Sequence, residues 1–299
     1  MRKRITIILK RIIRALCATN NLKRLGYPGN TKLLIIHADD IGLSSSENAA
    51  TFDAFKKGMV NSGSVMVNCA AFHEVADFIA DKPGIDLGVH LTLTSEWESY
   101  KWRPVSPSME VPGIIDQNGF LLESNAMIKE KVSYGNIEKE FRAQIIKAIT
   151  SGIDITHLDS HMFTVFSDKK ILEIYRSLGR EYKLPVLLTK EVPVKTLVQK
   201  SEVIVDQLYY AEPKHYRNGL KGYYSSVLQS LRPGLNCILI HMAFDNHEMK
   251  QITGNQSGYG SAWRQEDYDY FTGEECSRLL KENNIHLITW REIRDKLIR

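Results

Sequence analysis

Apolar, β-branched runs alternate with amphipathic stretches along most of this 299-residue chain, and this alternation constrains its fold more than any other feature. Parallel strands joined by crossover helices produce such a pattern, because each buried strand is covered by the helix that follows it. We predict strands near 32–37, 62–68, 85–93, 154–161, 185–189, 202–206, 236–242 and 285–289. The helical patterns lie near 46–57, 71–80, 136–151, 168–181, 219–231, 273–283 and 290–298.

Seven or eight such units favour a closed, barrel-like sheet over an open one. The sequence therefore predicts the α/β class and a distorted (β/α) barrel, similar to a TIM barrel, with parallel strands inside and helices outside. We expect the helix over 136–151 to start at an Asn136 N-cap and to stop at Gly152. Two long connections interrupt the alternation, at about 95–135 and 243–270. Loops of this length in a compact domain are usually functional.

The first 24 residues carry eight basic side chains and no acidic one, whereas the whole chain has a net charge of only +4. The remainder is slightly acidic, which argues against a general nucleic-acid-binding protein. We divide the chain into a basic N-terminal segment over 1–30, helical or frayed, and a single domain over 31–299. The apolar residues of the segment fall at helical spacing, which leaves a solvated helix and a weak membrane-surface contact both open. Its longest uncharged apolar run, residues 5–9, is short for a membrane span or a signal peptide, so we expect a cytoplasmic protein.

The four cysteines are far apart in the sequence and form no CxxC pair: Cys17, Cys69, Cys237 and Cys276. A cysteine-based zinc site is therefore not expected. Their scattered positions are typical of small buried side chains in a reducing compartment.

Ionisable side chains stand at or near the carboxyl ends of four predicted strands. They are Asp39 with Asp40, His90, Asp159 with His161, and His241. A single histidine at such a place is more often a hydrogen-bonded core residue than a ligand. Barrel enzymes, however, build their sites on this face, so the coincidence across four strands indicates one functional site.

The segment over 154–161 carries three ionisable residues within five positions. His157, Asp159 and His161 share one face if it forms a strand. A helix would also align the two histidines, but the β-branched lead-in and Gly152 favour a strand. Two histidines and a carboxylate suit a divalent ion such as Zn²⁺, Mg²⁺ or Mn²⁺, and a second carboxylate can deprotonate the water that such an ion activates. This chemistry hydrolyses an amide or an ester.

Four motifs keep their order and spacing from about residue 31 onward: HADDIGLS, SGSVMVN, DLGVHLTLT and THLDSH. They resemble the motifs of the YdjC-like carbohydrate deacetylases, also called chitooligosaccharide deacetylases of the ChbG/HpnK type. The resemblance implies a distorted barrel related to the polysaccharide deacetylases. It also implies a bound divalent metal, usually assigned as magnesium with zinc as the alternative, and removal of acetyl from an N-acetylated sugar or oligosaccharide. The chain departs from many relatives after His161, where they have further histidines and it has Met162 and Phe163, so we expect a more apolar pocket.

The resemblance also assigns residues to roles. Carried over by motif, the metal ligands are Asp40, His90 and His161. Asp39 corresponds to the general base. His241 corresponds to a residue that protonates the leaving amine or stabilises the oxyanion.

We expect Asp159 and His157 behind the ligands, where they would orient them. The candidates for substrate binding lie on the two long connections: Trp97, Trp102, Trp263 and Arg264. Aromatic side chains there suit stacking on the apolar face of a sugar, and packing over the barrel mouth is equally open.

Two other functions stay open. A metal-dependent phosphoesterase would need several Lys or Arg near the metal, and Arg264 alone lies on a candidate loop. A non-catalytic sugar-binding barrel predicts the loss of the base or of a ligand, and neither is lost. The sequence thus predicts an enzyme, a carbohydrate N-deacetylase, whose partner is a small carbohydrate and not a nucleic acid.

Overall fold

The computed structural model describes residues 21–131, 133–190, 202–217, 219–254, 256 and 258–299. The predicted basic helix with its membrane-surface contact falls in residues 1–20, outside the described residues, and so does Cys17. Among the described helices, none combines the length and the apolar character needed to cross a membrane. The other three cysteines are free and buried, as predicted.

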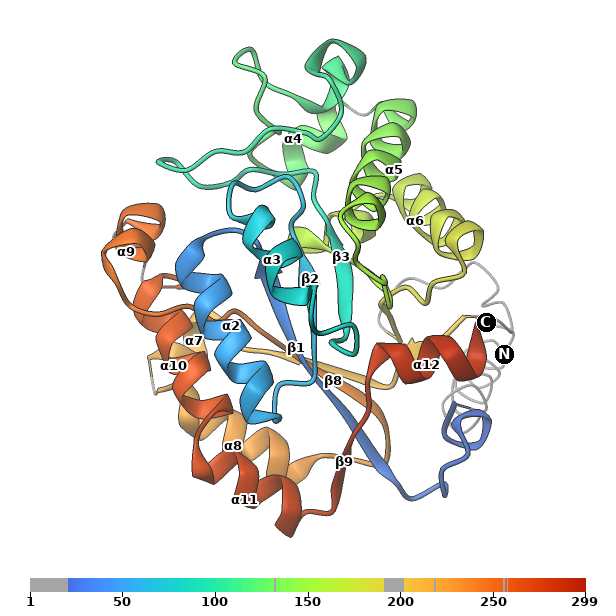
Figure 1. The fold of residues 1–299 in the computed structure, drawn as a ribbon, viewed down its shortest axis with the longest axis vertical. Helices are drawn as coiled ribbons and strands as arrows, with labels where there is room; N and C mark the ends of the chain where they lie inside the picture. The colour runs from blue at the N-terminus through green and yellow to red at the C-terminus, as the bar shows by residue number, and fades with distance from the viewer. Residues whose placement is uncertain (1–20, 132, 191–201, 218, 255, 257) are drawn as a thin grey trace, which may run out of the picture.

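A curved, parallel sheet forms the centre of the molecule (Figure 1). Its strands follow the order β4-β3-β2-β1-β8-β7, with β9 beside β1. They are β1 (Lys32–Ile41), β2 (Ser62–Val65), β3 (Leu87–Leu91), β4 (Leu158–Ser160), β7 (Gln207–Tyr210), β8 (Gly234–Ile240) and β9 (Ile285–Leu287). Beyond β4, a bridge from Leu158 to Val186 leads toward a second small sheet, β5 (Leu188–Thr189) with β6 (Ile204–Val205). Because β6 is followed closely by β7, which pairs with β8, the strands curl back in chain order, and the predicted distorted barrel is confirmed.

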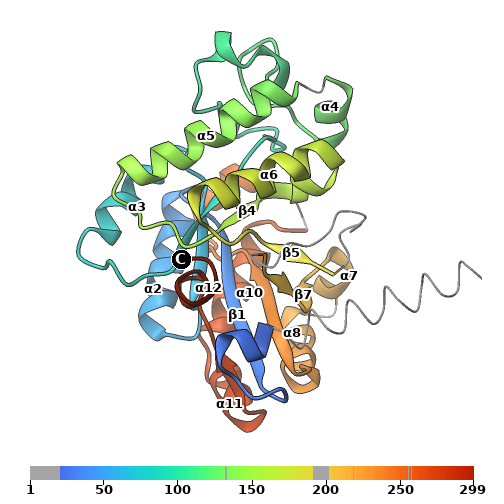
Figure 2. The same ribbon diagram turned by 90° about the vertical axis from the view of Figure 1, so that its right-hand side faces the viewer.

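Helices lie outside the strands, with α2, α8, α10 and α11 on one side and α5 and α6 on the other (Figures 1 and 2). Their bounds are α2 (Ser45–Lys57), α3 (Phe72–Ile79), α4 (Asn125–Glu130), α5 (Tyr134–Thr150), α6 (Lys169–Tyr182), α7 (Pro213–Tyr216), α8 (Leu220–Ser230), α9 (His247–Thr253), α10 (Ser261–Phe271), α11 (Glu274–Glu282) and α12 (Trp290–Leu297). The described residues also include three short 3-10 helices: η1 (Ser108–Glu110), η2 (Pro112–Ile114) and η3 (His161–Phe166). All seven predicted helices are present.

Three local predictions are wrong. The connection predicted over 243–270 contains α9 and α10, because its buried face includes polar side chains that hide the helical period. Asn136 does not cap α5, because this helix starts earlier, directly after Ser133. The side-chain oxygen of Asn136 instead accepts a hydrogen bond from Gly113 N at 2.9 Å. The strand predicted over 154–161 is confined to Leu158–Ser160, and His161 starts η3.

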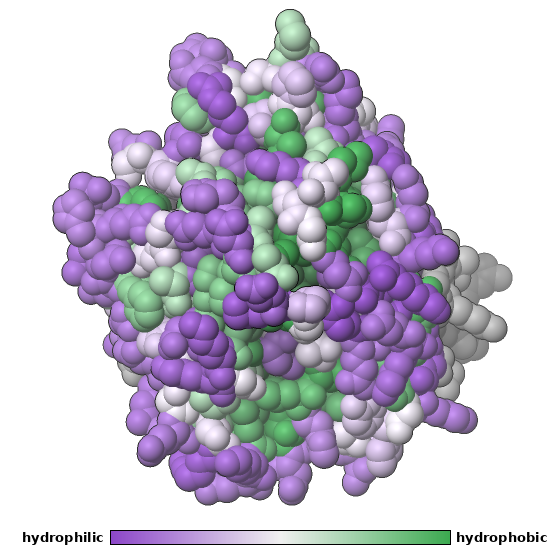
Figure 3. All heavy atoms as spheres, viewed as in Figure 1, coloured by the Kyte–Doolittle hydropathy of each residue, from purple (hydrophilic) through white to green (hydrophobic). Residues whose placement is uncertain are grey.

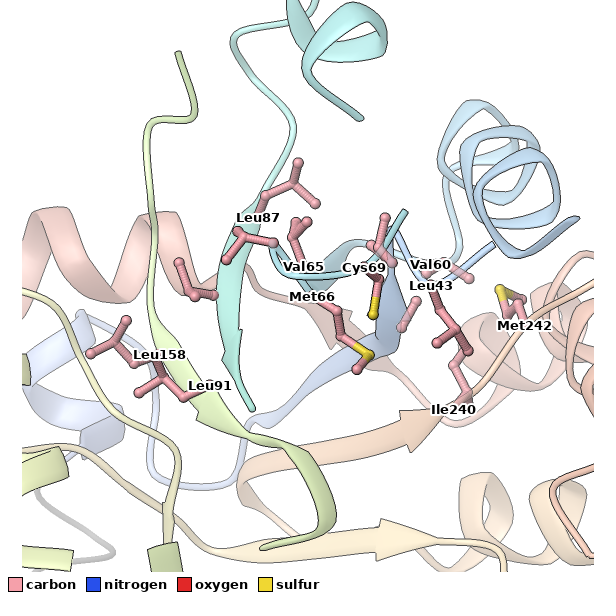
Figure 4. Close-up of a cluster of buried hydrophobic side chains, with 14 of the residues drawn as sticks. Leu43, Val60, Val65, Met66, Cys69, Leu87, Leu91, Leu158, Ile240 and Met242 are labelled. Carbon is pink, nitrogen blue, oxygen red and sulfur yellow. The ribbon is translucent and has the colours of Figure 1, made fainter. Parts of the chain in front are cut away.

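The two faces of β1 pack into two different hydrophobic clusters. Leu34, Ile36 and Ala38 face the outer helices, whereas Leu33 and Ile35 point inside the barrel with side chains from β8 and α12. Figure 4 shows part of the outer cluster, in which side chains from β2, β3, β4 and β8 lie close together. On the outside, hydrophilic residues dominate the face seen in Figure 3. The odd-numbered residues of β1 therefore lead along the inside of the barrel to Asp39.

Candidate functional site

The adjacent acids Asp39 and Asp40 both line one cavity, although neighbouring residues of a regular strand point to opposite faces. An irregularity in the pairing of β1 with β2, between Ala38 and Ile41, makes this possible. Asp40 lies within this irregular part of β1 and has a φ of 62°. This left-handed conformation costs a non-glycine residue about 1–2 kcal/mol. Backbone strain of this kind is found mostly at functional sites.

Asp40 meets two histidines from other parts of the sheet. Its Oδ1 lies 3.4 Å from Nε2 of His90 and 3.2 Å from Nδ1 of His161. Each residue offers a ligand atom, and these atoms lie within 4.8 Å of one another. Burial alone would raise the pKa of Asp40, but the close ring nitrogens and the positive charges of His161 and His90 hold that pKa well below its usual value. Oδ1 is buried and accepts no well-formed hydrogen bond from the described residues, so a divalent cation fits among these three side chains.

Each of these histidines contacts a carboxylate with its other ring nitrogen. His90 Nδ1 lies 2.8 Å from Asp159 Oδ1, and His161 Nε2 lies 2.9 Å from Glu96 Oε1. Such carboxylate partners hold an imidazole so that its free nitrogen faces an ion. Asp159 lies behind the three side chains and contacts His90 and Ser64. Glu96 was missed.

His37 is a second residue that the sequence analysis missed. Its Nε2 lies 3.2 Å from Asp39 Oδ1 and 3.1 Å from Asp159 Oδ2, and its Nδ1 lies 2.9 Å from Ser62 Oγ. Burial alone would lower the pKa of His37, but the two carboxylates outweigh it and raise the pKa to about 9. A protonated His37 therefore holds Asp39 and Asp159 together. The signal was its position two residues before Asp39, on the same face of β1.

The oxygens of Asp159 are already occupied. Ser64 Oγ donates to Oδ2 at 2.8 Å, the oxygen that His37 also contacts, and His90 contacts Oδ1. Asp39, His90 and Asp159 also come close enough to hold an ion. Because Asp159 has no free oxygen, the set with Asp40 and His161 suits a cation better.

His157 is fully buried beneath this network. Its Nδ1 lies 2.9 Å from Thr156 Oγ1, and its ring stacks on Trp290 and meets the ring of His37 edge-on. Gly88 makes room for it, because a Cβ there would lie 2.5 Å from the imidazole. His157 thus supports His37 by packing, and its hydrogen bond is with Thr156, so it does not orient a proposed ligand directly.

His241, directly after β8, approaches Asp39 from the other side. Its Nε2 lies 3.8 Å from Asp39 Oδ2, and partial burial lowers its pKa. Its backbone N–H donates to Asp267 Oδ2 at 3.0 Å, and Tyr224 Oη donates to the other oxygen at 2.6 Å. Asp267 therefore fixes the end of β8 to α10. Burial raises the pKa of Asp267 to about 7.

Arg264 is buried between two carboxylates. Its Nη2 donates to Asp40 Oδ2 at 3.1 Å and its Nη1 to Glu47 Oε1 at 2.6 Å. The guanidinium thereby occupies one oxygen of Asp40 and leaves Oδ1 for His90 and His161. Its charge is already paired, although Arg264 does line the cavity.

The cavity has a volume of about 360 Å³, within the range of small-molecule sites. Asp39, Asp40, His90, His161 and His241 all line it, together with Trp97 and Arg264 of the predicted substrate-binding residues. The other two tryptophans lie behind it. Trp102 donates its Nε1 proton to Thr94 O at 2.8 Å, and Trp263 stacks on Tyr216 and packs against Tyr259.

Asp267 makes stability depend on pH in a definite direction. The pKa of Asp267 in the folded chain, about 7, lies above its value in the unfolded chain. Between about pH 4 and 7 the folded chain therefore keeps a proton on Asp267 that the unfolded chain has lost. The free energy of unfolding falls as the pH rises through that window. In Asp267→Asn this penalty is absent. From pH 5 to pH 8 the variant should therefore gain about 3 kcal/mol relative to the wild type in urea unfolding. Asp269→Asn, on the exposed face of the same helix, is the control, and a constant difference between Asp267→Asn and wild type would contradict the assignment.

The chain is similar in sequence to one family of known proteins and in fold to a solved structure. The sequence model of the YdjC-like protein family matches residues 33–282. A carbohydrate deacetylase of Thermus thermophilus is 30% identical over 291 residues, which cover 92% of this chain and 98% of that protein. One from Thermoanaerobacter pseudethanolicus is 26% identical over 260 residues, covering 87% and 98%. The crystal structure of an Enterococcus faecalis V583 protein proposed to cleave cellobiose phosphate superposes with a TM-score of 0.73 at 24% identity, over 88% of this chain and 99% of that one, which establishes the shared fold.

Proposed function

Because this chain belongs to the YdjC-like protein family, we propose that it is a carbohydrate deacetylase that uses a divalent metal ion to remove acetyl from an N-acetylated sugar. The convergence of Asp40, His90 and His161 beside Asp39 and His241 carries the proposal. The carbohydrate deacetylases to which the chain is similar over nearly their whole length support it.

Asp40, His90 and His161 would hold the ion, since a buried carboxylate oxygen with no well-formed hydrogen bond faces two ring nitrogens there. When bound, the ion would polarise the acetyl carbonyl and lower the pKa of water. We propose magnesium, as the family resemblance implies, with zinc as the ion that two histidines also suit.

Hydrolysis of an amide needs one group that takes a proton from the attacking water and one that gives a proton to the leaving nitrogen. We assign the first task to Asp39. Its Oδ1 contacts His37, so Oδ2 is the oxygen that can accept the proton. His241 Nε2, 3.8 Å from Oδ2, can receive that proton and deliver it to nitrogen. The C–N bond then breaks, and acetate and a free amine leave.

The pairing of Arg264 disfavours a phosphoesterase. A phosphate needs cationic side chains that are free to contact its oxygens. Arg264 is the one arginine among the cavity-lining residues of the described chain, and Glu47 and Asp40 already occupy it. A non-catalytic barrel is disfavoured because both proposed proton-transfer groups are present beside the proposed ligands.

Trp97 should govern affinity more than the chemical step. It lines the cavity, and stacking on a sugar ring stabilises the bound ground state and the transition state about equally. Trp97→Ala should therefore raise KM about three- to tenfold with kcat nearly unchanged, and Trp97→Phe should restore most of the affinity. Trp263→Ala, a change behind the cavity, is the comparison and should lower stability instead. A collapse of kcat in Trp97→Ala at unchanged KM would contradict this role.

An acetate-release screen tests the proposed function. The full-length chain, stripped of metal by a chelator, is assayed on N-acetylated mono- and oligosaccharides with Mg²⁺, Zn²⁺ or Mn²⁺ added back. We expect acetate and a free amine in equal amounts, only with a metal, and none from Asp40→Asn. Full activity in the presence of the chelator would overturn the metal requirement, and phosphate release from sugar phosphates without acetate release would favour the phosphoesterase.

A further inference from the structure

The proton transfers proposed above do not use His37, although this residue lies against the proposed general base, Asp39. Its side chain is 1% exposed, and it does not line the cavity, so a substrate cannot reach it. A buried histidine among carboxylates is costly to keep unless it is well paired. Any effect of His37 on the reaction must therefore pass through the residues that it contacts.

One ring nitrogen of His37, Nε2, lies beside two carboxylates. It donates a hydrogen bond to Asp159 Oδ2 at 3.1 Å and lies 3.2 Å from Asp39 Oδ1. Because ionised carboxylates only accept hydrogen bonds, Nε2 must carry a proton. Asp39 Oδ1 is buried and accepts no well-formed hydrogen bond from the described residues, so attraction to the nearby ring offsets its charge.

The other ring nitrogen, Nδ1, lies 2.9 Å from Ser62 Oγ. The Ser62 hydroxyl also hydrogen-bonds the carboxylate of Asp86, and this bond opposes the rise that burial causes in the pKa of Asp86. A hydroxyl has a single proton, which goes to the carboxylate, so Nδ1 must donate its own proton to Ser62 Oγ. Both ring nitrogens are therefore protonated, and the ring carries a positive charge.

The charged ring connects two carboxylates that have different tasks. Asp159 is held from its other side by His90 Nδ1, which lies 2.8 Å from Asp159 Oδ1. Asp39 contacts His37 through Oδ1, and its Oδ2 lies 3.8 Å from His241 Nε2. His37 thus ties the proposed base to the same carboxylate that orients the proposed ligand His90.

Packing keeps the ring of His37 in this orientation. The ring of His157 meets it edge-on with centroids 4.9 Å apart, and His157 in turn stacks on Trp290 at the start of α12. Burial and the charge of His37 both lower the pKa of His157, so that ring stays neutral. The position of His37 therefore depends on packing, and its charge depends on its hydrogen bonds.

We propose that His37 is a positioning residue for the deacetylation step, a cation that fixes Asp39 against Asp159 and so directs Asp39 Oδ2 toward the attacking water. His37 itself touches neither the substrate nor the proposed ion. The inference rests on the proposed function and adds a residue to its machinery. A displacement of about 1 Å in a reacting group costs on the order of 100-fold in rate, which sets the effect expected when the ring is lost.

Two substitutions test the role of the ring. In His37→Asn the amide reaches only as far as Nδ1, so Ser62 keeps a partner and Asp39 loses the cation. In His37→Gln the amide reaches the position of Nε2 and can donate there without a charge. We expect kcat for acetate release to fall about 100-fold in H37N and about tenfold in H37Q, while KM and the affinity for the added metal change less than about threefold. His286→Asn, the same change at an exposed histidine on β9, should leave kcat unchanged.

NMR of the full-length chain measures the charge of the ring without an activity assay. In the metal-free wild type labelled with ¹⁵N-histidine, the signals of His37 are those absent from either variant. Both of its ring nitrogens should be protonated at pH 7, and a neutral ring with one protonated nitrogen would overturn the inference. Circular dichroism shows whether each variant keeps the fold, and if one unfolds, the other carries the kinetic test.

The outcomes separate this inference from the proposed function. Acetate release by the wild type together with near-full kcat in both variants overturns the inference and leaves the proposed function standing. A metal affinity that falls in H37N as far as in Asp40→Asn also overturns it, because His37 would then support the ion and not the base. If the wild type releases no acetate from any N-acetylated sugar, the proposed function is overturned, and the assignment of His37 to that reaction with it.

Discussion

Asp39→Asn and His241→Ala should each lower kcat for acetate release by about 10²–10⁴-fold, the usual contribution of one general acid or base. Neither side chain belongs to the proposed ligand set, so both variants should bind metal nearly as well as the wild type. The two contact each other through Asp39 Oδ2 and His241 Nε2. If they act in one proton transfer, the double variant should lose little more than either single one.

Steady-state kinetics at saturating metal, with metal binding measured on the same samples, checks this expectation. Asp81→Asn, the same change on an exposed turn, is the matched control. Near-full activity of His241→Ala would rule out its role as the proton donor. Loss of the ion in Asp39→Asn would make that residue a ligand.

Asp40→Asn should weaken metal binding by about 100-fold or more, since a change even in a residue that only supports a ligand costs 10–100-fold. The variant is well suited to this measurement, because asparagine accepts the left-handed φ of 62° at this position. The fold should therefore survive. Calorimetric titration of Zn²⁺ and Mg²⁺ into stripped protein measures the affinity, with circular dichroism as the check on folding.

Asp39→Asn serves as the paired control, because it makes the same substitution one residue away. If Asp39→Asn lost the ion and Asp40→Asn kept it, the proposed roles of the two acids would have to be exchanged. Equal affinity in both variants and the wild type would place the ion elsewhere.

Much of the candidate site could be predicted because the carboxyl ends of the parallel strands of a barrel lie together on one face. Asp40, His90 and His161 are 50 or more residues apart in pairs, yet each stands at or just after a strand end, and the parallel sheet brings them together. Sequence alternation could not show that both Asp39 and Asp40 enter the cavity, because a regular strand would separate them. Only the irregularity in β1 does so.

Glu96 and α10 were missed because their partners come from distant elements. Glu96 lies in an irregular connection, and nothing near it in sequence points to His161. Helix α10 was missed for a related reason. Its buried residues include Arg264 and Asp267 with Trp263, so its hydrophobic period is interrupted where it packs against the site. Trp102 and Trp263 were placed among the substrate candidates because an aromatic residue on a presumed loop cannot be distinguished by sequence from one that packs inside.

The ion pairs of Arg264 have a consequence for the order in which the protein forms. Asp40 and Glu47 are both buried, and their shared cation comes from 224 and 217 residues further along the chain. A chain emerging from the ribosome completes β1 and α2 long before α10 exists, and burying two carboxylates without their cation is costly. This part of the barrel can therefore become compact only after most of the chain has been made. A nascent chain that ends before residue 261 would therefore contain β1 and α2 without the cation that pairs with Asp40 and Glu47.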